Sequence, residues 1–146
     1  SHSLKYNLYG YWQNKESIKK MKVAVLFEGE KGTMQLNSYL KDNNSVAVCG
    51  SNLSYEQIKM LISLGVEEIV FAFDKQYENK QEELQWRAKI MKLAYRIPPS
   101  VKVSVIWDSL ENGLLDYKDS PTDKGKEIYL ELFNDRIDFK DFEVVI

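Results

Sequence analysis

Residues 23–28 read Val-Ala-Val-Leu-Phe-Glu, and residues 69–74 read Ile-Val-Phe-Ala-Phe-Asp. Each stretch is an unbroken apolar run that ends at an acidic residue. Runs of this kind are typical of strands that are covered on both faces, as in a parallel sheet. Parallel sheets place their chemistry at the carboxyl ends of the strands. The sequence therefore predicts that Glu28 and Asp74 reach one edge of the same sheet, where two carboxylates on rigid elements suit a divalent metal.

Strands and helices are expected to alternate around these two runs. Apolar spacing predicts helices over residues 15–20, 33–41, 54–64, 81–96 and 124–134, and further strands over 46–49 and 101–107. Ser54 and Gln57 form a capping-box pattern at the start of the third helix, and Gly65 stands where a helix is expected to end. The predicted fold class is α/β, with about four mostly parallel strands flanked by helices. The expected boundaries are a lead-in over 1–21, the α/β domain over 22–135 and a strand-like tail over 136–146.

Length and composition narrow the possible classes of protein. A chain of 146 residues with a net charge of −2 is expected to form one domain that does not grip duplex DNA by charge alone. The single cysteine excludes an internal disulfide and the usual cysteine-based zinc site. No apolar run approaches the roughly 20 residues of a membrane span, so no membrane partner and a cytoplasmic location are expected. The opening Ser1–Ser3 resembles an expression remnant, and His2 is excluded from any mechanism for that reason.

Four ordered motifs together resemble the TOPRIM domain of bacterial-type and phage-type DNA primases. They are Val-Leu-Phe-Glu-Gly at 25–29, the strand and small-residue turn at 46–54, Val-Phe-Ala-Phe-Asp at 70–74 and Asp-Tyr-Lys-Asp at 116–119. The resemblance extends over about residues 6–133 and implies a TOPRIM, Rossmann-like domain. It also implies a metal-dependent nucleotidyltransferase that makes RNA primers during DNA replication.

The resemblance assigns roles to particular residues. Glu28 matches a glutamate that acts as general acid and base, and Asp74 and Asp119 match ligands of Mg²⁺ or Mn²⁺. Gln76 stands where the family has a second aspartate, which keeps an oxygen ligand but removes a negative charge and weakens metal binding. Lys75 is expected to offset that lost charge or to neutralise a phosphate, and it is grouped with Glu28 as catalytic.

Further positions are assigned to phosphate or nucleic-acid contacts: Gly29, Lys31, Gly50 and Lys118. A plain surface role is the alternative for the two lysines beside the acidic motifs, Lys31 and Lys75. The late motif also departs from the family, because Ser-Pro follows Asp119 and the next carboxylate, Asp123, arrives two residues late.

The implied partners are single-stranded DNA template, ribonucleotides and, through the parent protein, a replicative helicase. The family's zinc-binding and basic template-binding parts are missing from this chain, so it is expected to be inert or nearly so alone. Two alternatives stay open: a TOPRIM nuclease or topoisomerase module, and a degenerate scaffold that binds nucleic acid without catalysis. Gln76 favours the scaffold.

Overall fold

The computed structural model describes residues 7–144 of the chain. The predictions for residues 1–6 and for residues 145–146 lie outside this range. Within it, the strands are β1 (Val23–Phe27), β2 (Ser45–Ala47), β3 (Glu68–Phe71), β4 (Lys102–Val105) and β5 (Ile137–Asp138). The helices are α1 (Tyr11–Met21), α2 (Glu30–Tyr39), α3 (Tyr55–Ile62), α4 (Lys80–Ala94), α5 (Lys126–Asn134) and α6 (Phe139–Val144).

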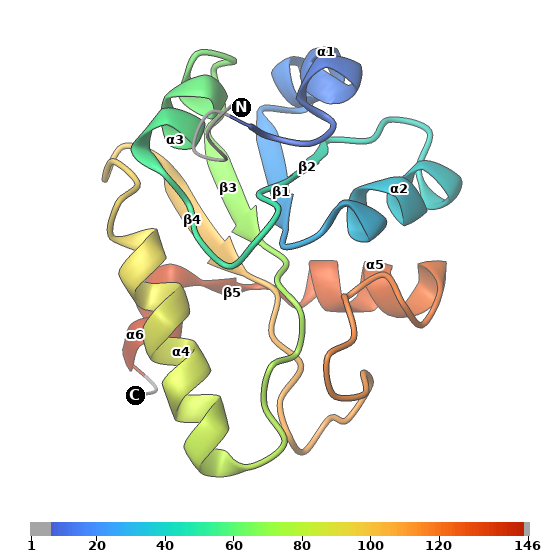
Figure 1. Ribbon diagram of the computed structural model, residues 1–146, viewed down its shortest axis with the longest axis vertical. Coiled ribbons are helices and arrows are strands. Elements are labelled where there is room, and N and C mark those ends of the chain that lie inside the picture. The colour runs from blue at the N-terminus through green and yellow to red at the C-terminus, as the bar shows by residue number, and fades with distance from the viewer. Residues whose placement is uncertain (1–6, 145–146) are drawn as a thin grey trace.

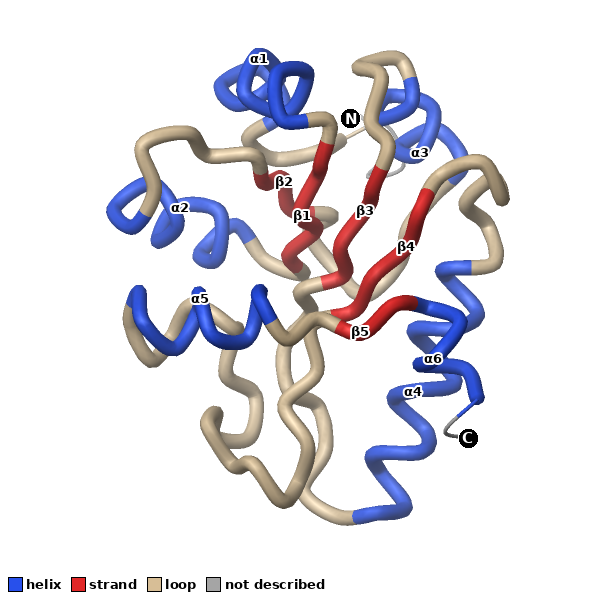
Figure 2. Tube along the Cα trace, turned by 180° about the vertical axis from the view of Figure 1, so that it is seen from behind, coloured by secondary structure: helices blue, strands red, loops and turns tan. Residues whose placement is uncertain are grey.

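The strands form one sheet in the order β2-β1-β3-β4-β5, as Figures 1 and 2 show. The first four are parallel, with Leu26 of β1 opposite Phe71 of β3, and β5 joins the edge antiparallel to β4. The predicted α/β class with a mostly parallel sheet is confirmed, with five strands in place of about four.

Both faces of the sheet are covered, as the unbroken apolar runs predict. Successive residues of a strand point to opposite faces, so Ala24 and Leu26 pack with α1, α3, α4 and α6, whereas Val25 and Phe27 pack with α2 and α5. All four side chains are fully buried or nearly so. This two-sided burial holds β1 rigidly and fixes the position of Glu28 at its end.

Local sequence signals explain several boundaries. Ser54 caps α3 through a complete capping box with Gln57, and Gly65 adopts a left-handed conformation with φ of 79° after the helix, as predicted. Asn79 caps α4 by accepting a hydrogen bond from the Glu82 backbone N–H. No helix within residues 7–144 is long and apolar enough to cross a membrane.

The C-terminal segment differs from the predicted strand-like tail. Only Ile137 and Asp138 form a strand, and residues 139–144 form α6. The β-branched residues at the end of the sequence favour a strand locally. Phe142 instead turns inward, where it is fully buried and contacts the Trp107 ring edge to face.

Candidate functional site

The two predicted strand-end carboxylates lie together. Glu28 follows β1 and Asp74 follows the exit of β3, and these strands are neighbours in the sheet. The backbone N–H of Asp74 donates a hydrogen bond to Oε1 of Glu28 at 2.9 Å. The parallel register thus joins two residues 46 positions apart in the sequence at one edge.

Both carboxyl groups hold their protons more tightly than usual. Burial raises the pKa of Glu28 to about 7, the charge of Asp74 adds to this, and a hydrogen bond from the Gln76 amide partly opposes it. Burial also raises the pKa of Asp74 to about 6, with help from the charges of Asp123 and Asp119. Because these half-buried carboxylates repel each other, a cation bound at this edge would stabilise their ionised forms.

The acidic loop after residue 115 supplies the other two carboxylates, and lysines already contact them. Asp123 pairs with Lys31 at the start of α2, with an N–O distance of 3.0 Å. Asp119 accepts the Asp116 backbone N–H at 2.8 Å and lies 3.4 Å from the Lys124 ammonium. The loop is thus folded and partly neutralised by the chain's own cations.

Backbone hydrogen bonds attach this loop to the segment that follows β3. The Lys75 N–H donates to the Asp119 carbonyl at 2.9 Å, and the Lys118 N–H donates to the Lys75 carbonyl at 2.8 Å. This pairing sets Asp119 beside Asp74 in space. The late motif therefore reaches the same edge as the two strand-end carboxylates.

The geometry bears on whether a metal fits. Across residues 7–144, no three carboxylate, thiol or imidazole side chains are placed to hold a metal ion by themselves. The donor chemistry nevertheless matches a hydrated magnesium or manganese ion, which needs one or two carboxylates and takes its other oxygens from water and substrate phosphates. The described residues do not surround an ion on all sides, and an open site of this kind suits an ion that keeps several water ligands.

The Gln76 side chain contacts Glu28. Its amide donates toward the Glu28 carboxylate, which lowers the pKa of that group. The side chain therefore lies at the acidic edge, where its contact is to Glu28.

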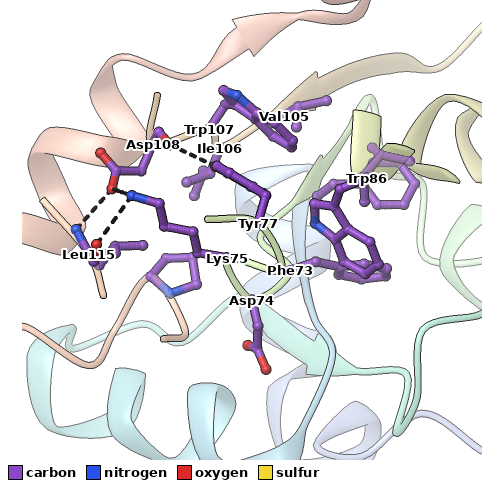
Figure 3. A pocket seen from close by; sticks show the side chains of 13 residues that line it. Phe73, Asp74, Lys75, Tyr77, Trp86, Val105, Ile106, Trp107, Asp108 and Leu115 are labelled. Carbon is purple, nitrogen blue, oxygen red and sulfur yellow. Dashed lines mark hydrogen bonds and ion pairs between the residues drawn. The ribbon is translucent and has the colours of Figure 1, made fainter. Parts of the chain in front are cut away.

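Lys75 takes a different place from the one predicted. Its ammonium is buried, with only 7% of the side chain exposed, and pairs with Asp108 at 2.7 Å. It also donates to the Leu115 carbonyl at 3.2 Å. Figure 3 shows the Lys75 side chain pointing toward Asp108 while the Asp74 carboxylate points away from it. The prediction that Lys75 offsets charge or contacts phosphate at the acidic edge is wrong, because Asp108 holds its ammonium in the interior.

The predicted phosphate contacts fall into distinct surroundings. Gly29 and Gly50 border open space, since a Cβ built on either would meet no atom within 4 Å. The Gly50 N–H donates to the Glu28 carbonyl at 3.1 Å, which places this turn beside the acidic edge. Lys118 is exposed and lies over the Tyr117 ring, and the Lys31 ammonium is held by Asp123.

Lys124 and Lys89 are functional candidates that the sequence motifs did not single out. Lys124 neutralises the acidic loop, and Lys89 of α4 lies near enough to lower the pKa of Glu28. Their sequence signal is weak, because both are ordinary exposed lysines in charged stretches.

Comparison with known proteins gives one similar curated sequence. No family model matches the chain. The SPbeta prophage-derived uncharacterized protein YorJ of Bacillus subtilis (strain 168) is 40% identical over 148 residues, a match that covers 94% of this chain. The chain spans only 39% of the length of that relative.

Solved structures with the same fold are primase domains. A DNA primase domain from Pseudomonas aeruginosa aligns with a TM-score of 0.70 and 17% identity, over 97% of this chain and 42% of that one. A DnaG primase catalytic domain bound to ssDNA aligns with a TM-score of 0.69 and 15% identity, over 98% of this chain and 43% of that one. The chain has the TOPRIM-type fold of primase catalytic cores, as its motifs predict.

Proposed function

We propose that this chain is the metal-dependent nucleotidyl-transfer module of a primase-type replication protein that makes RNA primers on single-stranded DNA. The observation that carries the proposal is the joining of Glu28 and Asp74 at adjacent parallel strand ends, with the acidic loop bonded alongside. The primase-type fold supports the same class of chemistry. The similarity to a prophage-derived protein supports a phage origin.

In this proposal Glu28 handles the proton of the reaction. The oxygen of a primer 3′-hydroxyl attacks the α-phosphorus of a ribonucleotide, and the bond from that phosphorus to pyrophosphate breaks. Glu28 accepts the hydroxyl proton, for which a pKa of about 7 is well matched to neutral pH. The amide of Gln76 and the N–H of Asp74 orient the Glu28 carboxylate.

Asp74, with Asp119 and the amide oxygen of Gln76 nearby, would hold a hydrated Mg²⁺ or Mn²⁺ together with the nucleotide phosphates. Such an ion supplies charge stabilisation for the phosphates and the leaving pyrophosphate. The open backbone at Gly29 and Gly50 leaves room for a phosphate at this edge.

A non-catalytic scaffold that binds nucleic acid is the second candidate. The observation that favours it is the pairing of Lys31 and Lys124 with the acidic loop, which neutralises carboxylates that a metal would otherwise use. In the scaffold, these ion pairs are permanent. In the enzyme, metal and nucleotide displace them.

Calorimetry of Mn²⁺ binding to the chain, with and without a non-hydrolysable ribonucleotide, separates the two. The enzyme requires Mn²⁺ binding that tightens with nucleotide and is lost in Asp74→Asn. Asp42→Asn is the control, because Asp42 pairs with Lys20 on the surface, apart from the acidic edge. Primer synthesis by the parent protein should disappear in Glu28→Gln. Absent Mn²⁺ binding and undiminished synthesis in these variants would leave only the scaffold.

A further inference from the structure

A groove of about 500 Å³ lies between α4 and the loop that joins β2 to α3. Lys89, Lys92 and Arg96 line one side, and Ser51 and Asn52 line the other. None of the lining residues is acidic. In Figure 1 the C-terminal end of α4 lies beside this loop, and the rest of the helix runs downward away from it. The groove is therefore a positively charged channel on a chain whose overall charge is negative.

The two lysines of the groove differ from those of the acidic edge. Lys31, Lys75 and Lys124 each form an ion pair with a carboxylate. Among the residues that the structure describes, Lys89 and Lys92 form no ion pair, and both are exposed. Their charge is therefore available to an external anion.

The spacing of the three cations suits a linear anion. Lys89 and Lys92 lie about one turn apart on α4, and Arg96 follows in the turn just after the helix ends at Ala94. A row of cations along one side of a groove is the arrangement that tracks the backbone of a single strand. Arg96 is fixed at the far end, where its Nη1 donates to Asn52 Oδ1 at 2.9 Å and to the Leu53 carbonyl at 2.7 Å. These two hydrogen bonds hold the guanidinium against the loop on the other side of the groove.

The two ends of the groove suggest its polarity. At one end, Lys89 lies near enough to Glu28 to lower the pKa of that carboxyl group. At the other end, Tyr55 is 61% exposed and its ring lies under the Arg96 guanidinium, 5.9 Å from it. An exposed aromatic ring beside cations is the arrangement on which unpaired bases stack.

We propose that this α4 groove binds the phosphodiester backbone of single-stranded DNA and leads the strand toward Glu28. Lys89, Lys92 and Arg96 contact successive phosphates, and Tyr55 stacks on a base. The direction of the strand rests on the proposed function. The residues that contact the template lie outside the acidic edge.

The test is fluorescence anisotropy of a labelled oligothymidylate of about 12 nucleotides, measured in EDTA over a series of NaCl concentrations. Because no metal is present, failure of the proposed metal site leaves this measurement unaffected, and Asp74→Asn should bind the strand at least as well as the wild type. Lys89→Gln/Lys92→Gln should weaken binding on the order of tenfold at low salt and reduce the slope of log K against log[salt] by about 1.4.

The control is Lys19→Gln/Lys20→Gln, which makes the same charge change on exposed lysines of α1. It should bind the strand like the wild type. Tyr55→Ala should weaken binding without changing the salt slope, since it removes stacking and no ion contact. Equal losses in the α1 and α4 double variants would overturn the proposal, as would wild-type affinity in the α4 variant.

A second probe separates a strand from a nucleotide. The same variants are titrated with a fluorescent ribonucleoside triphosphate in the presence of Mg²⁺. The α4 double variant should retain this binding while it loses the oligothymidylate. Loss of the triphosphate with retention of the strand would overturn the proposal and assign the groove to nucleotide.

Discussion

Glu28→Gln should stabilise the protein at pH 8 and leave its stability unchanged at pH 4. In the folded chain the pKa of Glu28 is raised from 4.5 to about 7, mainly by burial. The native state therefore binds the proton more tightly than the unfolded state, and the free energy of unfolding falls as pH rises between these two values. Glutamine carries no charge at any pH and still offers an oxygen to the Asp74 N–H, so the substitution removes this loss alone.

The size of the effect follows from the same difference. At about 1.36 kcal/mol for each pKa unit, the free energy of unfolding would rise by about 3 kcal/mol if the carboxylate were fully buried. The Glu28 side chain is only partly buried, and solvent screening reduces the expected gain to about 1–2 kcal/mol. In a chain of this size, that corresponds to a rise in Tm of roughly 2–8 °C at pH 8.

Urea denaturation of wild type and variant at pH 4, 6 and 8 measures it. Glu68→Gln is the matched control, because hydrogen bonds from Arg136 and Ser104 outweigh burial and hold the pKa of Glu68 below its usual value. Its contribution to stability is present above the unfolded pKa and is lost as pH falls, so Glu68→Gln should destabilise the chain at pH 8. A Glu28→Gln protein that is no more stable at pH 8 than the wild type, or whose gain is the same at pH 4, refutes the reasoning.

Three further outcomes are expected. Gln76→Asp should tighten Mn²⁺ binding in calorimetry by roughly tenfold, because it restores a carboxylate at the acidic edge; unchanged affinity would mean that this side chain does not reach the ion. Lys75→Met should lower the free energy of unfolding in urea by about 3–5 kcal/mol, because its buried partner carboxylate loses its counter-ion; a loss below 1 kcal/mol would contradict the buried pair. Gly32→Ala should cost about 1–3 kcal/mol in the same assay, since its Cβ would lie 2.6 Å from the Phe27 ring. Gly29→Ala, which meets no atom, should cost less than about 1 kcal/mol, and similar losses in both would show that packing does not distinguish them.

The parts of the fold that sequence could predict are those with two-sided burial or a local cap. The unbroken apolar runs of β1 and β3 predict strands that are buried on both faces of a sheet. The ends of these runs then predict where Glu28 and Asp74 lie. The capping box at Ser54 needs only its own residues to form. In contrast, α6 exists because Phe142 packs on Trp107 and Arg87, two contacts that come from distant elements.

The error at Lys75 had a signal in the sequence. The extended chain after β3 keeps the alternation of the strand, so Asp74 and Gln76 are partly exposed on one side while Lys75 and Tyr77 are buried on the other. Adjacency to an acidic residue favoured a shared site, but side chains at successive extended positions point apart. The partner of Lys75, Asp108, is 33 residues away, and no local pattern predicts that pair.

Because of this alternation, Lys75 supports the acidic edge from the interior, although its side chain does not lie at that edge. Its side chain anchors the interior by pairing with Asp108 and by donating to the carbonyl of Leu115, just where the acidic loop begins. Its backbone exchanges hydrogen bonds with Lys118 and Asp119. One residue thus holds both the end of β3 and the loop that brings the late carboxylate to it. Rigid support of this kind holds Asp119 beside Asp74, and such preorganisation is what the proposed phosphoryl-transfer site would require of its protein.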